Sequence, residues 1–144
     1  MWSHTVEYAL RAMVYLSTRS PNTCTTEEIA AATHVPKHYL SKVLQLLARS
    51  GLVQSHRGLR GGINLARSPE QMTVHDIISA VDVRTHAHGR EAGLTHGERF
   101  DEVHRRIHEV LARVEEAFET TTLVELAEPH PRTLQREPSV TDEA

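Results

Sequence analysis

Residues 25–67 limit the possible folds most strongly, because helix and turn signals follow one another closely there. Within this segment, "PKHYLSKVLQLLAR" has apolar residues at Leu40, Val43, Leu44 and Leu47. The spacing i, i+3, i+4, i+7 predicts an amphipathic helix with this apolar face buried. The opposite face is then polar and basic and carries Lys37, His38, Ser41, Lys42 and Gln45.

A short helix is predicted immediately before this one. Thr25 and Glu28 have the spacing of a capping box, in which each side chain bonds a free backbone N–H at the helix start. The break at "THV" leads into Pro36, which suits a first helical turn because its missing N–H would have no partner there. Two helices joined by a tight turn predict a helix-turn-helix, whose second helix enters the DNA major groove.

A hairpin is predicted after the second of these helices. Gly51 is placed as a C-terminal cap, and the strand-like "LVQSH" and "INLAR" flank the turn "RGLRGG". Arg57 and Arg60 lie at its tip among glycines. The glycines let the protein backbone approach the phosphate backbone or the narrow minor groove of DNA. A polar stripe alone is usually a solvated surface, but this order of elements predicts a winged helix that binds double-stranded DNA.

The charge distribution supports this interpretation. Residues 1–67 contain eight Lys/Arg and three acids, a net charge of +5, whereas residues 68–144 contain eight Arg and sixteen acids, a net charge of −8. A basic module joined to an acidic one is typical of a small DNA binder with a separate partner or dimer face. With no membrane-length apolar run and one cysteine, Cys24, we expect a soluble, cytoplasmic protein.

The second half of the chain predicts two further helices and a terminal one. The first begins at Thr73, with Asp76 in its first turn, and "TTTLVELA" predicts the terminal one. Between them, apolar residues alternate spacings of three and four, which favours a dimer seam. Leu111 and Phe118 widen this stripe, so packing on the helix's own domain is also open. The seam residues are Phe100, Val103, Ile107, Val110 and Val114.

The sequence resembles the Rrf-type transcription regulators, the group that contains IscR, NsrR and CymR. The resemblance rests on "EYALRAMVYL", the helix-wing segment with its "RGLRGG" tip, and "MTVHDIISAVD", and it resumes over the long helix to "TTLVELA". It implies a homodimer that places two winged helices on a pseudo-palindromic operator. It also implies that His38, Tyr39, Ser41 and Lys42 occupy DNA-contacting positions of the recognition helix and that Arg57 occupies the wing position. From the residues alone, Tyr39 is equally well a half-buried packing residue.

The predicted fold class is mainly α: a winged helix-turn-helix with a small β-hairpin wing, plus a long C-terminal dimerisation helix. We expect residues 1–82 to form the DNA-binding domain and residues 83–97 a sensor-type loop. Residues 98–128 should form the dimerisation helix and a short terminal helix. Residues 129–144 have the composition of a disordered tail.

The sensor-type loop lacks the ligands that the resemblance would imply. Cluster-bearing members hold three cysteines there, the last of them three residues before a histidine, whereas this chain has Gly93 at that position and retains His96. Because iron-sulfur clusters require thiolates, we expect no conventional cluster and no resident cofactor. A metal bound by His86, His88 and His96 is the alternative, since neutral imidazoles suit zinc, copper, nickel or iron. A solvated loop is the third possibility.

Three function classes follow from these observations. The first is a sequence-specific DNA-binding regulator, a repressor, that acts as a homodimer without a cluster. The second is a winged-helix dimer that serves as a protein-protein interaction module, and the third is an enzyme. Clustered cations at Lys37, Lys42, Arg57 and Arg60 favour the first class, because they suit a phosphate backbone. No nucleophile motif, phosphate loop or zincin motif supports an enzyme.

Overall fold

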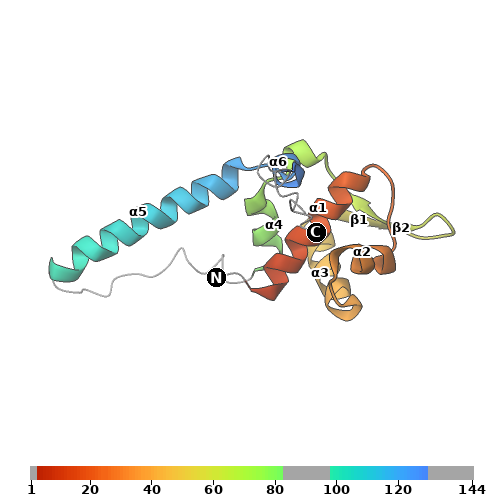
Figure 1. The fold of residues 1–144 in the computed structure, drawn as a ribbon, viewed down its shortest axis with the longest axis horizontal. Coiled ribbons are helices and arrows are strands. Elements are labelled where there is room, and N and C mark those ends of the chain that lie inside the picture. Colours follow the sequence, from red (N-terminus) through yellow and green to blue (C-terminus); the bar gives the residue numbers. More distant parts are fainter. Residues whose placement is uncertain (1–2, 83–97, 130–144) are drawn as a thin grey trace, which may run out of the picture.

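One long helix projects from a helical body in the computed structural model (Figure 1). The structure describes residues 3–82 and 98–129, so the histidine-containing segment 83–97 and the segment from residue 130 onward lie outside it. The elements are α1 (His4–Arg19), α2 (Thr26–Thr33), α3 (Lys37–Arg49), β1 (Val53–His56), β2 (Gly62–Leu65), the 3-10 helix η1 (Pro69–Gln71), α4 (Val74–Val81), α5 (Glu98–Thr120) and α6 (Leu123–Ala127).

The predicted fold class is confirmed. The described residues form a mainly helical winged helix-turn-helix with one two-stranded antiparallel hairpin, β1-β2, and the long helix α5. Helix α1 is central, because α2, α3, α4 and α6 all contact it. Its small residues Ala9 and Ala12 are fully buried, which allows these helices to approach closely. Leu40 and Leu47 of α3 are also fully buried, as the helical spacing predicted.

Helix ends are set by local side-chain chemistry. Capping boxes begin three helices, formed by Thr25 with Glu28, Thr73 with Asp76 and Thr122 with Glu125. In each of them the threonine hydroxyl accepts a hydrogen bond from the backbone N–H of the acid, and the carboxylate of the acid accepts one from the backbone N–H of the threonine. The sequence prediction for Pro36 needs a correction. Pro36 is the N-cap of α3, and its carbonyl accepts a hydrogen bond from the Leu40 N–H, so the first helical residue is Lys37.

Gly51 turns the chain from α3 into the wing. Its φ of 73° is in the left-handed region, where glycine carries no Cβ penalty. The Gly51 N–H donates to the Ala48 carbonyl and the Leu52 N–H to the Leu47 carbonyl, which is the Schellman pattern of helix termination. Leu47 and Leu52 are both buried, so the apolar contact that accompanies this pattern is available.

The segment after α5 returns to the body. Helix α6 packs against α1, and Leu123 at its start is fully buried. The Val74 N–H donates to the Thr121 carbonyl and the Leu123 N–H donates to the Met72 carbonyl. These contacts cross the predicted boundary at residue 82, so α4 and α6 hold the C-terminal end of α5 against the winged helix. Within the described residues, no helix is long and apolar enough to span a membrane.

Candidate nucleic-acid interface

Helix α3 presents a polar face to solvent. Leu40, Val43, Leu44 and Leu47 are buried, and the helical repeat therefore directs the side chains between them outward. Ser41 is partly exposed. The remaining predicted DNA-contacting residues of this helix are all exposed: Lys37, His38, Tyr39, Lys42 and Gln45.

Lys37 is already engaged in a contact within the helix-turn-helix. Its Nζ donates to Oε1 of Glu27, the second residue of α2, and the two groups form an ion pair. The Lys37 hydrogen bond lowers the pKa of Glu27 below its ordinary value of 4.5. Glu27 is therefore ionised at neutral pH, and its negative charge lies beside the cation at the start of the recognition helix.

Tyr39 packs against the body on one side, and its role as a DNA contact stays a prediction. Its ring meets Tyr8 of α1 edge-on, with centroids 6.0 Å apart, and lies 4.7 Å from the His38 ring. Yet 49% of its surface remains accessible. Packing thus fixes the ring on one side, and the other side is free to meet a ligand.

The polar groups on the rest of this face differ in whether they already have hydrogen-bond partners within α3. The Ser41 Oγ donates a 3.0 Å hydrogen bond to the Lys37 carbonyl. Its hydroxyl proton is therefore used within the helix, and its oxygen can still accept a hydrogen bond. Lys42 and Gln45 are exposed on the same face, where an ammonium can reach a phosphate or guanine and an amide can pair with adenine.

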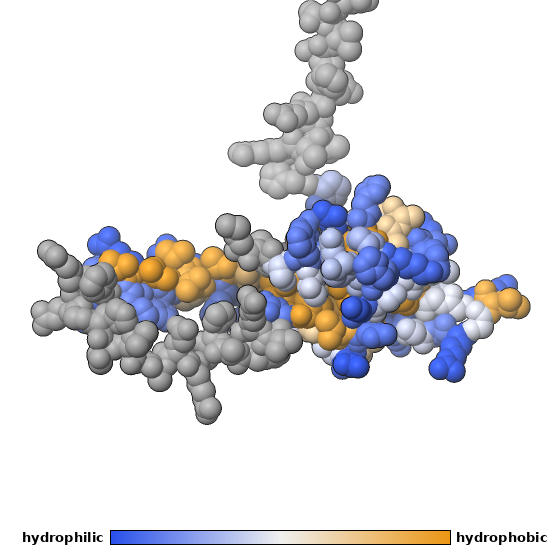
Figure 2. Space-filling view, turned by 90° about the horizontal axis from the view of Figure 1, so that it is seen from below, coloured by the Kyte–Doolittle hydropathy of each residue, from blue (hydrophilic) through white to orange (hydrophobic). Residues whose placement is uncertain are grey.

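The wing is a tight hairpin with its cations at the tip. Strands β1 and β2 pair in antiparallel register from Val53 with Leu65 to His56 with Gly62, and the Gly61 N–H closes the turn onto the Gly58 carbonyl. Arg57 and Arg60 are exposed in this turn. Leu59 lies between them and is fully exposed, with a relative accessibility of 109%. Figure 2 shows an apolar spot at the outer end of the body, opposite α5.

Cys24 fixes the base of the wing to the helix-turn-helix. Its backbone N–H and carbonyl bond the Ile63 backbone at 2.8 and 2.7 Å, which forms an isolated antiparallel β-bridge beside β2. A Cβ on Gly62 would lie 2.8 Å from the Cys24 carbonyl oxygen, so this close approach needs glycine. No sequence motif pointed to Cys24 or Leu59. The wing glycines were predicted to let the backbone approach DNA, and Gly62 instead lies against the Cys24 backbone.

Helix α5 exposes an apolar face along most of its length. Figure 2 shows a continuous apolar row on the projecting helix. Only near its C-terminal end does a described apolar side chain, Phe118, pack against the core. The Phe100 side chain lies outside the described part. The large apolar residues on the exposed face are 41–57% accessible: Val103, Ile107, Val110, Leu111 and Val114.

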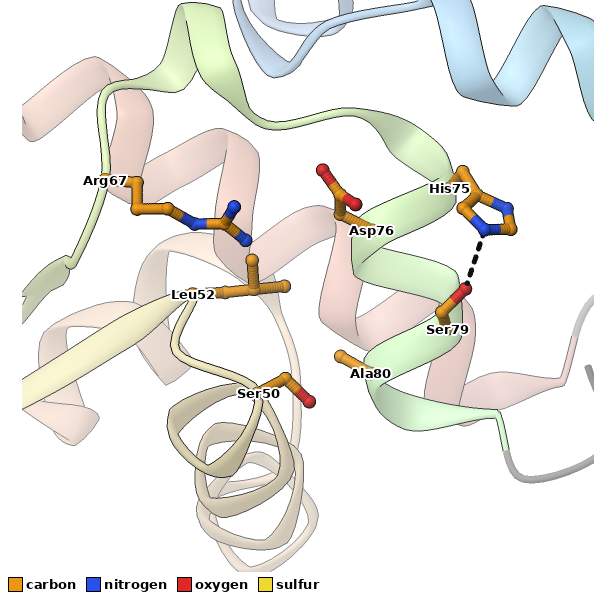
Figure 3. Close-up of a pocket in the computed structure, with 7 residues that line it drawn as sticks. All are labelled: Ser50, Leu52, Arg67, His75, Asp76, Ser79 and Ala80. Carbon is orange, nitrogen blue, oxygen red and sulfur yellow. Dashed lines mark hydrogen bonds between the residues drawn. The ribbon is translucent and has the colours of Figure 1, made fainter. Parts of the chain in front are cut away.

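A shallow hollow lies between α4 and the junction of α3 with β1 (Figure 3). Arg67 reaches across it toward Asp76, whose carboxylate accepts a hydrogen bond from the Thr73 N–H. The His75 ring and the Ser79 hydroxyl bond each other at 3.3 Å. The polar groups of α4 thus already have local partners. The residues that line the hollow are Ser50, Leu52, Arg67, His75, Asp76, Ser79 and Ala80.

Comparison with known proteins assigns this winged helix to a family. Residues 2–129 match the family Rrf2, described as "Iron-dependent Transcriptional regulator". The chain belongs to the Rrf2 family. An HTH-type transcriptional regulator from Aquifex aeolicus is 32% identical over 133 residues, which cover 88% of this chain and 90% of that protein. The regulator NsrR of Geobacillus kaustophilus is 30% identical over 85% of this Rrf2 chain and 86% of its own.

Solved structures agree with this assignment. CymR, the global cysteine regulator of B. subtilis, has a TM-score of 0.72 and 28% identity, with 88% of this chain and 95% of that chain covered. IscR of T. potens shares the fold, with a TM-score of 0.69 at 24% identity over 88% of this chain and 85% of that one. The predicted resemblance is confirmed. This Rrf2 protein is a transcriptional regulator and not an enzyme.

The donor set of this Rrf2 chain does not fit an iron-sulfur cluster. The chain has one cysteine, and an iron-sulfur cluster is held by several thiolates. Cys24 is buried, and its backbone joins the wing to the helix-turn-helix, so it is a structural residue. Within residues 3–82 and 98–129, no group of three His, Cys, Asp or Glu side chains is close enough together to hold a metal ion.

Proposed function

We propose that this Rrf2 regulator binds double-stranded DNA sequence-specifically as a homodimer, with α3 in the major groove and the wing on the adjacent backbone and minor groove. The observation that carries the proposal is the two-sided character of α3. Its apolar side is buried in the core, and its other side presents exposed Lys42 and Gln45. Such a helix, supported by a second one across a tight turn, suits the major groove in size and chemistry.

The roles of the site residues divide by chemistry. Gln45 and Lys42 are proposed to read base edges, because an amide pairs with adenine and an ammonium with guanine. Arg57 and Arg60 are proposed to neutralise phosphates, whereas Lys37 is available to a phosphate only when its ion pair with Glu27 opens. Tyr39 and His38 are proposed to contact DNA with the exposed side of their rings, and Ser41 with its hydroxyl oxygen. This division predicts that Gln45 and Lys42 determine the sequence preference.

Leu59 is proposed to supply an apolar contact. Leu59 is fully exposed between two exposed arginines, and the contact of its apolar surface with water is unfavourable. Minor-groove proteins often place an apolar side chain against the sugars or between base steps while nearby cations bind the phosphates. The wing has this combination at its tip.

Homodimerisation is proposed to occur through α5. Its apolar face has the three-and-four spacing of a coiled-coil seam, and within the described residues nothing covers Val103, Ile107, Val110 or Val114. A second copy offers the same face and so complements it by symmetry. Dimerisation also brings two recognition helices onto one DNA, as a pseudo-palindromic site requires.

We propose repression without an iron-sulfur cluster. Occupation of a promoter by a dimer is enough to exclude polymerase, so repression needs no further surface. The signal then comes from something other than a conventional cluster, because thiolate ligands are lacking. Metal binding by His86, His88 and His96 remains a separate proposal, and those residues lie outside the described part.

Selection from a random duplex library tests this function. We expect the full-length protein to enrich a site with two-fold related half-sites whose centres are about one helical turn, or a multiple of it, apart. Gln45→Ala should relax the consensus at one position in each half-site, whereas Arg57→Ala should weaken binding to all sequences. Failure of the wild-type protein to enrich any sequence would contradict the proposal.

A further inference from the structure

Two histidines on α5 direct ring nitrogens at one another. His104 and His108 lie one turn apart, and both are exposed. Their Nε2 atoms are 2.9 Å apart, and their ring centroids are 4.3 Å apart with an interplanar angle of 71°. Two histidine nitrogens bound to one metal at about 2.0–2.1 Å lie about 2.9–3.4 Å apart when they occupy adjacent coordination positions. The pair therefore already has the separation that chelation requires.

The charges around this pair favour a cation. Asp101 lies at i−3 from His104, which places it on the same side of the helix one turn before the two histidines. Two arginines lie between the histidines in sequence, and both are ion-paired. Arg105 bonds Glu102 at 2.7 Å and is also paired with Glu109, and Arg106 bonds Glu102 at 2.8 Å. These ion pairs offset the repulsion of a metal ion by the arginines.

We propose that His104 and His108 form a bidentate site for a divalent transition-metal ion of the zinc, nickel or copper class. Neutral imidazole is a preferred ligand of these ions. The shared hydrogen bond between the two Nε2 atoms is replaced by two metal-nitrogen bonds, with each ring holding its proton on Nδ1. Because the structure brings no third ligand side chain to this site among the described residues, water completes the coordination.

A bound ion would also stabilise this part of α5. It would link positions i and i+4, which fixes a helical turn, and it would sit at the edge of the apolar face beside Val103 and Leu111. The site is separate from α3 and the wing.

Titration calorimetry with nickel chloride on the full-length protein tests the proposal. The background is the His86→Gln, His88→Gln, His96→Gln variant, so that these histidines cannot supply binding. We expect one ion per chain and a loss of affinity of about tenfold or more in His104→Gln and in His108→Gln. His75→Gln, whose ring bonds Ser79 on α4, is the matched control and should bind as the background does.

The result that would overturn the proposal is unchanged nickel stoichiometry and affinity in the His104→Gln, His108→Gln double variant. Absence of nickel binding in the background protein would overturn it equally. Circular dichroism of each variant shows whether α5 remains helical, and both histidines are exposed, so their replacement leaves the core intact. No DNA is present in this experiment, so its failure would leave the proposed function untouched.

Discussion

Lys37, the first residue of α3, is ion-paired with Glu27 of α2. The pair links the two helices of the helix-turn-helix and at the same time places a negative charge on the proposed DNA face. Glu27 has a pKa lowered by this contact, so its contribution to stability is fully present above the ordinary pKa of 4.5 and is lost as the pH falls through the lowered value. Because Glu27 stays ionised at neutral pH, its charge can be removed there only by substitution.

We predict that Glu27→Gln strengthens binding to DNA at neutral pH. It removes a repulsive charge and frees Lys37 for a phosphate, so the dependence of log affinity on log salt should steepen by about 0.9. The affinity at low salt should rise about two- to fivefold. Fluorescence anisotropy with a labelled duplex measures both. In a Lys37→Gln background the same substitution should leave the salt slope unchanged, and an equal steepening there would show that Lys37 is not responsible.

Leu59→Ala should weaken DNA binding without changing its salt dependence. An apolar side chain releases no counterion, and its loss removes part of the transfer free energy of a buried leucine, which corresponds to about five- to thirtyfold in affinity. Leu59→Met keeps the apolar volume and should bind nearly as the wild type does. Equal affinities for Leu59→Ala and the wild type would show that the wing tip makes no apolar contact with DNA.

Val110→Asp should convert the proposed dimer to monomers. The charge would lie in the middle of the apolar face of α5, where burial against a second copy leaves it unpaired. Ala112→Asp is the matched control, because it introduces the same residue two positions later on the opposite side of the helix. Light scattering gives the mass in solution. A dimer that survives Val110→Asp would place the interface elsewhere.

His34→Gly should raise the free energy of unfolding by about 0.5–1 kcal/mol. His34 caps α2 with a φ of 57°, a conformation that a Cβ disfavours. The converse change, Gly51→Ala, should lower the free energy of unfolding by about 1 kcal/mol, because Gly51 has a φ of 73°. Nothing lies within 4 Å of the added Cβ, so its effect is that of the backbone alone. Urea unfolding measures both variants, and no gain for His34→Gly would contradict the backbone argument.

Local signals in the sequence predicted the helices and the wing well. Helical periodicity identified the buried leucines of α3, and the pairing of Thr25 with Glu28 identified the start of α2, because both depend on residues within two turns of each other. The strand segments on either side of "RGLRGG" were also predicted, because a glycine-rich turn between short apolar runs determines a hairpin.

Contacts between distant segments could not be predicted in this way. The bridge from Cys24 to Ile63 and the bond from the Leu123 N–H to the Met72 carbonyl join residues far apart in sequence, and no periodicity reports them. The Lys37–Glu27 pair depends on the angle between two helices. The same holds for Tyr39, whose packing on Tyr8 of α1 is decided by tertiary structure. The DNA and dimer roles of the named side chains remain predictions.

The salt dependence of duplex binding by the wild type and by the Arg57→Ala, Arg60→Ala double variant tests the central claim most directly. The phosphate contribution does not depend on sequence, so a mixed-sequence duplex is sufficient and no operator needs to be known. The account predicts a linear fall of log affinity with log salt for the wild type and a slope shallower by about 1.8 in the variant, since two phosphate contacts are lost. Salt-independent binding by the wild type, or identical slopes for the two proteins, would contradict it.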